Sequence, residues 1–74
     1  MLTDEELMDA RLKFIEEYGL GRAVGQYISE VLAHNVPEDE SRLVVYLSKK
    51  PPAHLRNTLP QLFMGAWIDC IVDD

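Results

Sequence analysis

The stretch from Thr58 to Val72, TLPQLFMGAWIDCIV, limits the possible folds more than any other part of the chain. Drawn as a helix, it carries apolar side chains on every face, interrupted mainly by Gln61 and Asp69. A helix that is apolar all round is buried, either by its own chain or by another one. The stretch is too short and too interrupted to span a bilayer, which needs about 20 apolar residues. We therefore predict a central core helix, or one half of an oligomer interface.

The N-terminal segment carries a set of signals for the start of a helix. Thr3 and Glu6 have the spacing of a capping box, and acidic residues fill the first turn, where they suit the helix dipole. Apolar residues between Leu7 and Tyr18 then recur over a broad arc. We predict a helix that ends at Gly19, with this glycine in the C′ position.

Residues 22–34 carry a second apolar stripe at helical spacing, followed by signals for a helix end. The stripe comprises Val24, Tyr27, Ile28, Val31 and Leu32. Small residues recur every four positions along its edge. Because glycine costs about 1 kcal/mol relative to alanine inside a helix, one of them, Gly25, indicates a close approach by another segment. We predict a second helix here.

The segment from Pro37 to Lys50 is ambiguous between helix and strand. Its ends are typical of a helix, with proline and acidic residues at the start and two lysines before Pro51. Its centre, Leu43 to Leu47, has the β-branched and aromatic composition of a strand. We favour a helix because no other segment indicates a strand with which this one could pair, unless it pairs with its own copy in a dimer.

These expectations combine into an all-α fold. The chain of 74 residues is predicted to form a single small helical domain, residues 1–74, near the lower size limit for an independent core. Its architecture would be a compact bundle of three to four short helices around the apolar C-terminal helix.

Composition excludes several classes of function. The net charge of −6 argues against direct binding to nucleic acid and to anionic membranes, because both depend on lysine and arginine. The single cysteine and the acidic start, which does not resemble a signal peptide, predict a cytoplasmic protein. The acidic balance favours a partner protein with a basic surface.

The residue types that carry catalysis or bind metals do not form a recognisable set. His34, His54 and Cys70 lie far apart and lack the local spacing of zinc ligands, and Cys70 lies in the most apolar stretch. The paired carboxylates are expected on solvated helix faces. The glycines near Gly19 follow a helix rather than a strand, so they do not form a phosphate-binding loop. We predict no catalytic residues, no metal and no cofactor, and hence no enzyme.

Two further residues attract attention as contact points. Arg11 falls inside the apolar arc of the first helix, where it would either pair internally or mark an interface. Trp67, the single tryptophan, would fill space in a core or anchor a partner at an interface.

The leading functional hypothesis is a non-enzymatic protein-binding regulator, an inhibitor or adaptor of the kind found in phages and mobile elements. It would cover a surface of a larger protein with an acidic helix face and exposed apolar residues. The predicted partner-binding residues are Asp4, Glu5, Asp9, Arg11, Glu16, Glu17 and Trp67. The alternative is a self-assembling structural subunit, a homodimer or larger homo-oligomer through the C-terminal helix.

Overall fold

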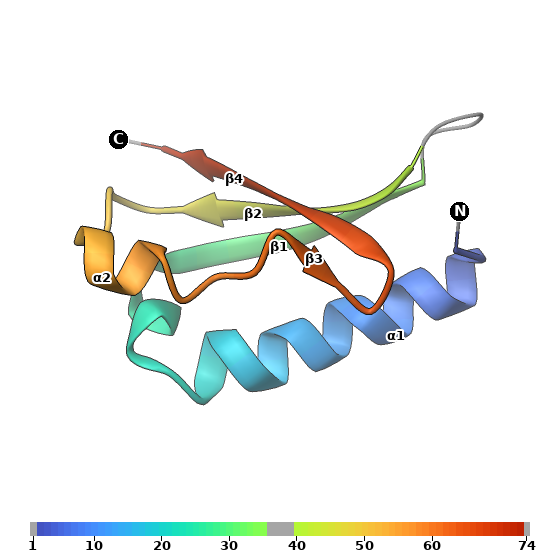
Figure 1. Cartoon of the computed structure of the whole chain (residues 1–74), viewed down its shortest axis with the longest axis horizontal. Helices are drawn as coiled ribbons and strands as arrows, with labels where there is room; N and C mark the ends of the chain where they lie inside the picture. The colour runs from blue at the N-terminus through green and yellow to red at the C-terminus, as the bar shows by residue number, and fades with distance from the viewer. Residues whose placement is uncertain (1, 36–39, 74) are drawn as a thin grey trace.

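The protein folds as two layers, one a mixed four-stranded sheet and the other composed of helices, so the all-α prediction is wrong (Figure 1). The structure is a computed structural model that describes residues 2–35 and 40–73. Its elements in chain order are α1 (Asp4–Phe14), the π-helical segment η1 (Ile15–Leu20), the 3-10 helix η2 (Ala23–Tyr27), β1 (Ile28–Asn35), β2 (Ser41–Leu47), α2 (Ala53–Arg56), β3 (Leu62–Phe63) and β4 (Ala66–Val72).

The strands lie in the order β1-β2-β4-β3. β1 and β2 are antiparallel, while β4 runs parallel to β2 and β3 returns antiparallel to β4. All helical segments lie on one side of the sheet, and no described element covers the other side (Figure 1). The fold therefore has a closed sheet face and an open sheet face.

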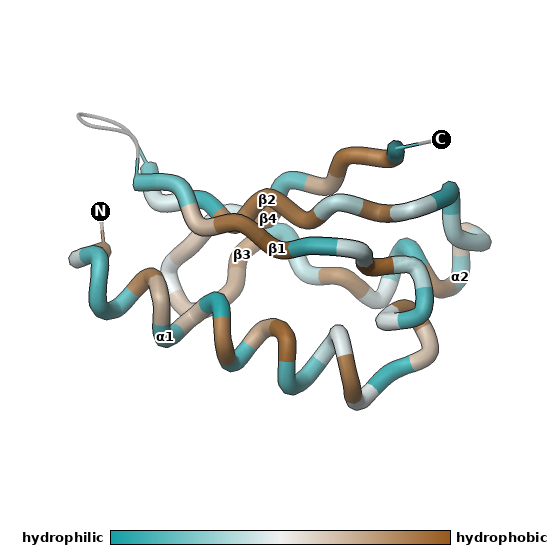
Figure 2. Tube along the Cα trace, turned by 180° about the vertical axis from the view of Figure 1, so that it is seen from behind, coloured by the Kyte–Doolittle hydropathy of each residue, from teal (hydrophilic) through white to brown (hydrophobic). Residues whose placement is uncertain are grey.

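The N-terminal helix is confirmed, including its capping box. The Thr3 hydroxyl accepts a hydrogen bond from the Glu6 backbone N–H at 3.1 Å, and the Glu6 carboxylate accepts one from the Thr3 N–H at 3.0 Å. The helix does not end at Gly19, because η1 continues through Leu20. Apolar and polar residues alternate along its length (Figure 2); Leu7, Ala10 and Phe14 belong to the core, whereas Met8 and Leu12 are exposed.

The core lies between α1 and the closed sheet face. Phe14 and Leu43 are fully buried at its centre. Phe14 packs against Tyr18 with ring centroids 4.8 Å apart, and Phe63 from β3 contacts both rings edge-on. The other buried core residues are Leu7, Ala10, Val24, Val31, Val45, Leu47, Leu59 and Ala66.

The helix expected over residues 37–50 is a strand, β2, from Ser41 to Leu47; residues 36–39 lie outside the described part. Within β2, Leu43, Val45 and Leu47 are fully buried, whereas the residues between them are partly exposed. This period of two is the signature of a strand with one face in the core. The argument against a strand was that no other segment could pair with it, but β1 and β4 pair with β2 on its two sides.

The helix expected over residues 22–34 divides into two elements. Only Ala23–Tyr27 is helical, as the short η2, and Ile28–Asn35 is β1. β-branched residues such as Val31 fit a pleated surface, and pairing with β2 satisfies the backbone of both strands. The apolar stripe at helical spacing came from combining one helical turn with a strand.

The apolar C-terminal helix is likewise wrong, because the stretch forms a β-hairpin. Met64 and Gly65 have positive φ angles of 51° and 86°, as in the two-residue turns that join tightly paired strands. β4 is apolar on both faces because Ala66 and Ile68 belong to the core side, whereas Trp67 and Ile71 belong to the open face. In this stretch, the many apolar residues reflect a strand with apolar side chains on both faces, not a buried helix.

Candidate protein-binding surfaces

The outer side of α1 presents acidic and apolar side chains together. Met8 and Leu12 are 47% and 54% exposed although both are large and apolar. With Glu5, Glu6 and Asp9 they line a shallow depression of about 460 Å³. These carboxylates form no ion pair with any described residue, so their charge acts outward. Glu16 is exposed as well, just beyond the end of α1.

Three of the residues predicted to bind a partner are engaged within the protein. Arg11 is partly buried and donates from Nε to the Val31 carbonyl oxygen at 2.7 Å, which ties α1 to β1. The Asp4 carboxylate accepts a hydrogen bond from the Asn35 side-chain amide at 2.9 Å. Glu17 forms an exposed ion pair with Arg22 at 3.1 Å. Arg11 is therefore a structural residue, and Asp4 and Glu17 also have internal roles.

Trp67 does not lie on the acidic helix face with which it was grouped. It belongs to β4, where it is in register with Arg42 of β2 and Leu62 of β3. Trp67 is 39% exposed and Leu62 is 52% exposed. The predicted residues therefore divide between two surfaces, with the carboxylates on α1 and η1 and Trp67 on the sheet.

The open sheet face is partly apolar and carries one charge network. The registers place Leu32, Val44, Tyr46 and Ile71 on the same side as Trp67. Arg42 pairs there with Asp69 at 2.9 Å and with Glu40 at 3.3 Å. The Arg42–Asp69 pair joins β2 to β4 and so links two neighbouring strands, while Arg42 shares its single positive charge between Asp69 and Glu40.

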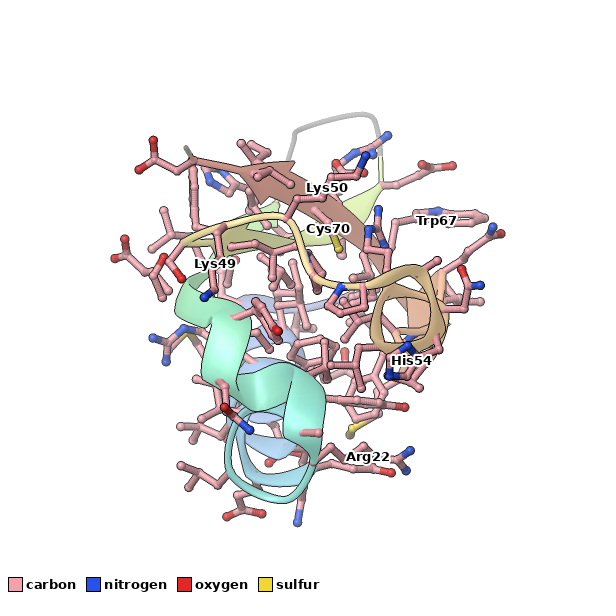
Figure 3. All side chains as sticks on the ribbon, turned by 90° about the vertical axis from the view of Figure 1, so that its left-hand side faces the viewer. Arg22, Lys49, Lys50, His54, Trp67 and Cys70 are labelled. Carbon is pink, nitrogen blue, oxygen red and sulfur yellow. The ribbon has the colours of Figure 1, made fainter. Side chains whose placement is uncertain are left out.

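A groove of about 560 Å³ follows the outer edge of β4. One wall is formed by Trp67, Ile68, Asp69 and Cys70, and the other by Arg56 and the segment after α2, with Asn57, Leu59 and Gln61. In Figure 3 the Cys70 side chain points inward from β4, while that of Trp67 points outward. Burial raises the pKa of the Cys70 thiol, and the nearby positive charge of Arg56 only partly offsets this effect.

Sequence reasoning missed this groove because it depends on the hairpin. Gly65, standing between two apolar runs, was the available signal for a tight turn. Arg56 carries no sequence signal of its own, since its relation to Cys70 arises only when α2 folds beside β4.

The arrangement gives no support to metal chemistry or cysteine catalysis. Within residues 2–35 and 40–73, no three His, Cys, Asp or Glu side chains are grouped closely enough to hold a metal ion. A raised thiol pKa at Cys70 is the opposite of what a nucleophilic cysteine needs.

The chain matches no protein-family model, no curated protein and no solved structure. No helix in the described part of the chain has the length and apolar character needed to cross a membrane. Any functional conclusion therefore rests on the geometry of the surfaces described above.

Proposed function

We propose that this protein is a non-enzymatic, protein-binding regulator that covers a basic surface of a larger protein with the outer face of α1. The observation that carries the proposal is the depression on α1, where exposed Met8 and Leu12 lie among the carboxylates of Glu5, Glu6 and Asp9. An apolar centre with a polar margin is the usual plan of a protein–protein interface.

The two kinds of side chain would make different contributions to binding. Met8 and Leu12 would supply affinity, since apolar groups that leave water on binding dominate the energetics of interfaces. The carboxylates would supply orientation and association rate, because unpaired charges of one sign steer a partner of opposite charge. The net charge of −6 acts in the same direction over the whole molecule.

α1 is well suited to present such a surface because its position is fixed. Its first turn is held by the capping box, its middle by the bond from Arg11 to Val31, and its buried side by Leu7, Ala10 and Phe14. Glu5, Met8, Asp9 and Leu12 can therefore be changed without disturbing the contacts that hold the fold, whereas Glu6 belongs to the capping box. A rigid helix face also limits the entropy that is lost on binding.

The test is a capture experiment in which the tagged protein is incubated with nuclease-treated host lysate. The bound proteins are then eluted with increasing salt. We expect the wild-type protein to retain one stoichiometric partner, which moderate salt releases. The double variant Glu5→Lys/Asp9→Lys should not retain this partner. Glu30→Lys/Asp73→Lys, at two exposed acidic positions outside α1, changes the net charge by the same amount and is the matched control, which should retain it. Equal capture by both variants, or no captured protein at low salt, would contradict the proposal.

The apolar half of the surface requires its own variant. Met8→Ser/Leu12→Ser removes the apolar centre while leaving every carboxylate in place. We expect this variant to retain less than a tenth of the captured partner, since two large apolar contacts are lost. Circular dichroism should show unchanged folding because both side chains are exposed.

A further inference from the structure

The outer edge of β4 carries backbone groups that no described strand uses. The Ile68 N–H donates toward β3, to the Gln61 carbonyl oxygen at 2.9 Å, whereas the Asp73 N–H donates toward β2, to the Leu47 carbonyl oxygen at 2.8 Å. Since successive residues of a strand direct these groups to opposite sides, Cys70 and Val72 direct theirs outward. β3 pairs only with Ala66 and Trp67, so within the described residues it does not reach this part of the edge.

The groove beside this edge has room for one more extended chain. Its volume is about 560 Å³, and the segment after α2 forms its far wall. Adjacent strands lie about 4.8 Å apart, so an added strand would occupy the groove at the level of Cys70. Leu59 and Ile68 give the groove apolar side-chain contacts, while Asn57 and Gln61 add polar ones.

The groove offers an incoming segment one positive charge. Arg56 lines it and forms no ion pair with any residue in the described part of the chain. Asp69 also lines it, but its carboxylate is engaged by Arg42 at 2.9 Å. A carboxylate on an incoming segment would therefore meet an uncompensated guanidinium, with which it can form two parallel hydrogen bonds.

We propose that this groove binds an extended segment of a partner protein that bears a carboxylate side chain, and that the segment adds to the sheet as a strand antiparallel to β4. The backbone of Cys70 and Val72 would exchange hydrogen bonds with it, as in other cases of strand addition. Antiparallel pairing is the more stable arrangement and continues the line of β3. The partner would thus lie on a different surface from that of α1, and the protein would join two partners.

A second copy of the chain is a poorer occupant of this edge. The symmetric antiparallel pairing that uses both Cys70 and Val72 is centred on Ile71, and it places Asp69 opposite Asp73 of the second copy. Like charges directly opposite one another in a sheet are destabilising. A pairing centred on Cys70 would place Val72 of the second copy opposite Ile68, whose N–H already bonds Gln61. A foreign strand meets neither obstacle.

The experiment selects binders for the intact protein from a displayed library of random peptides about ten residues long. We expect the selected peptides to contain Asp or Glu with alternating β-branched residues and to lack a net positive charge. Their binding should fall about tenfold with Arg56→Glu, a factor typical of losing and reversing one charge contact. Lys50→Glu, an exposed position outside the groove, should leave binding within about twofold.

A backbone variant tests strand addition directly. Val72→Pro removes an N–H that points away from β2, so the sheet should persist, as proline is tolerated at exposed strand edges. We expect it to abolish binding of the selected peptides, whereas Val72→Ala retains the N–H and the binding. In the wild-type protein, the Cys70 amide should become protected from hydrogen exchange when a selected peptide is added.

Four results would overturn the proposal. They are the absence of any selected peptide, selection of basic peptides, binding that survives Val72→Pro, and a dimer of the protein alone that Val72→Pro dissociates. The last would assign the edge to a second copy. The variants at Glu5 and Asp9 should leave peptide binding unchanged, so failure of this inference is distinguishable from failure of the function proposed for α1.

Discussion

Asn35 and Ser41, the last residue of β1 and the first of β2, are partners in the sheet register and also share a side-chain hydrogen bond of 2.6 Å. The Ser41 hydroxyl accepts a second bond from the Leu2 N–H at 2.8 Å, and the Asn35 amide donates to the Leu2 carbonyl oxygen and to Asp4, both at 2.9 Å. Ser41 is only 2% exposed. This network attaches the start of α1 to one end of the sheet.

Replacing Ser41 should be costly because it leaves two partly buried partners unpaired. In Ser41→Ala, the Leu2 N–H and the Asn35 side-chain oxygen both lose a bond, and we expect a loss of about 1–3 kcal/mol in the free energy of unfolding, measured with urea. Ser48→Ala, at an exposed serine whose long bond of 3.3 Å to the Tyr27 carbonyl oxygen can be replaced by water, should change it by less than about 0.5 kcal/mol. In a double-mutant cycle, Ser41→Ala and Asn35→Ala should be non-additive. Additive effects would show that the two side chains act separately.

The bond between Arg11 and Val31 should contribute both stability and protection of a sheet edge. Arg11→Met keeps much of the apolar stem but removes the Nε–H that reaches the Val31 carbonyl oxygen. We expect a loss of about 1–2 kcal/mol in the free energy of unfolding. Lys13→Met, at an exposed position of the same helix, is the control, with an expected change within about 0.5 kcal/mol.

Removal of Arg11 should also change how the protein associates. β1 is an edge strand, and a charged side chain placed against such an edge discourages pairing with other chains. We therefore expect Arg11→Met to sediment as larger species at high concentration, while Lys13→Met does not. Identical sedimentation of the two variants would restrict the role of Arg11 to stability.

Gly25 should tolerate no side chain, because backbone atoms occupy the space. A Cβ there would lie 2.6 Å from the Tyr18 carbonyl oxygen and would collide with the Gly19 carbonyl oxygen. We expect Gly25→Ala to lower the free energy of unfolding by about 1–3 kcal/mol in thermal denaturation, in the range of overpacked cores. At Gly19 a Cβ would meet Ile15 at 3.5 Å, an ordinary contact. Gly19→Ala should therefore be neutral or stabilising, and similar losses in both variants would contradict this interpretation.

The sequence predicted local features well and pairing poorly. The capping box of Thr3 and Glu6 is readable because its groups lie within one helical turn. Gly25 was correctly expected at a close contact, and its neighbour is the end of the first helical segment, at Tyr18 and Gly19. The strand character of Leu43 to Leu47 was visible and was set aside for want of a partner, since β1 and β4 had themselves been interpreted as helices. Because the segments of β1 and β4 were assigned the period of a helix, β1, β2 and β4 were all missed.

The candidate surfaces show the same difference between local features, which were predictable, and contacts between distant segments, which were not. The acidic outer face of α1 was predictable because a helix places its charges by local periodicity alone. The groove was not, because it requires β3 to end early, Arg56 to fold beside β4, and Cys70 to direct its backbone outward. Each of these depends on contacts between segments far apart in the sequence.

Cys70 should react slowly with alkylating reagents. Burial raises the pKa of its thiol above the ordinary value of 9.0, so less thiolate is present near neutral pH. We expect the rate of iodoacetamide modification, measured against pH, to reach half its maximum above pH 9.0, whereas a short peptide with one cysteine does so earlier. Arg56→Gln should slow the reaction further, because the positive charge of Arg56 lowers this pKa. A half-maximum at or below that of the peptide would contradict the prediction.

The same shift should make stability depend on alkaline pH. Because the pKa of Cys70 is higher in the folded than in the unfolded state, the unfolded thiol ionises first as the pH rises. The contribution of Cys70 to stability is therefore fully present below the unfolded pKa and is lost as the pH rises through the folded value. We expect the urea midpoint of the wild-type protein to fall more than that of Cys70→Ala between pH 7 and pH 10. Parallel curves for the two proteins would show that the thiol ionises equally easily in both states.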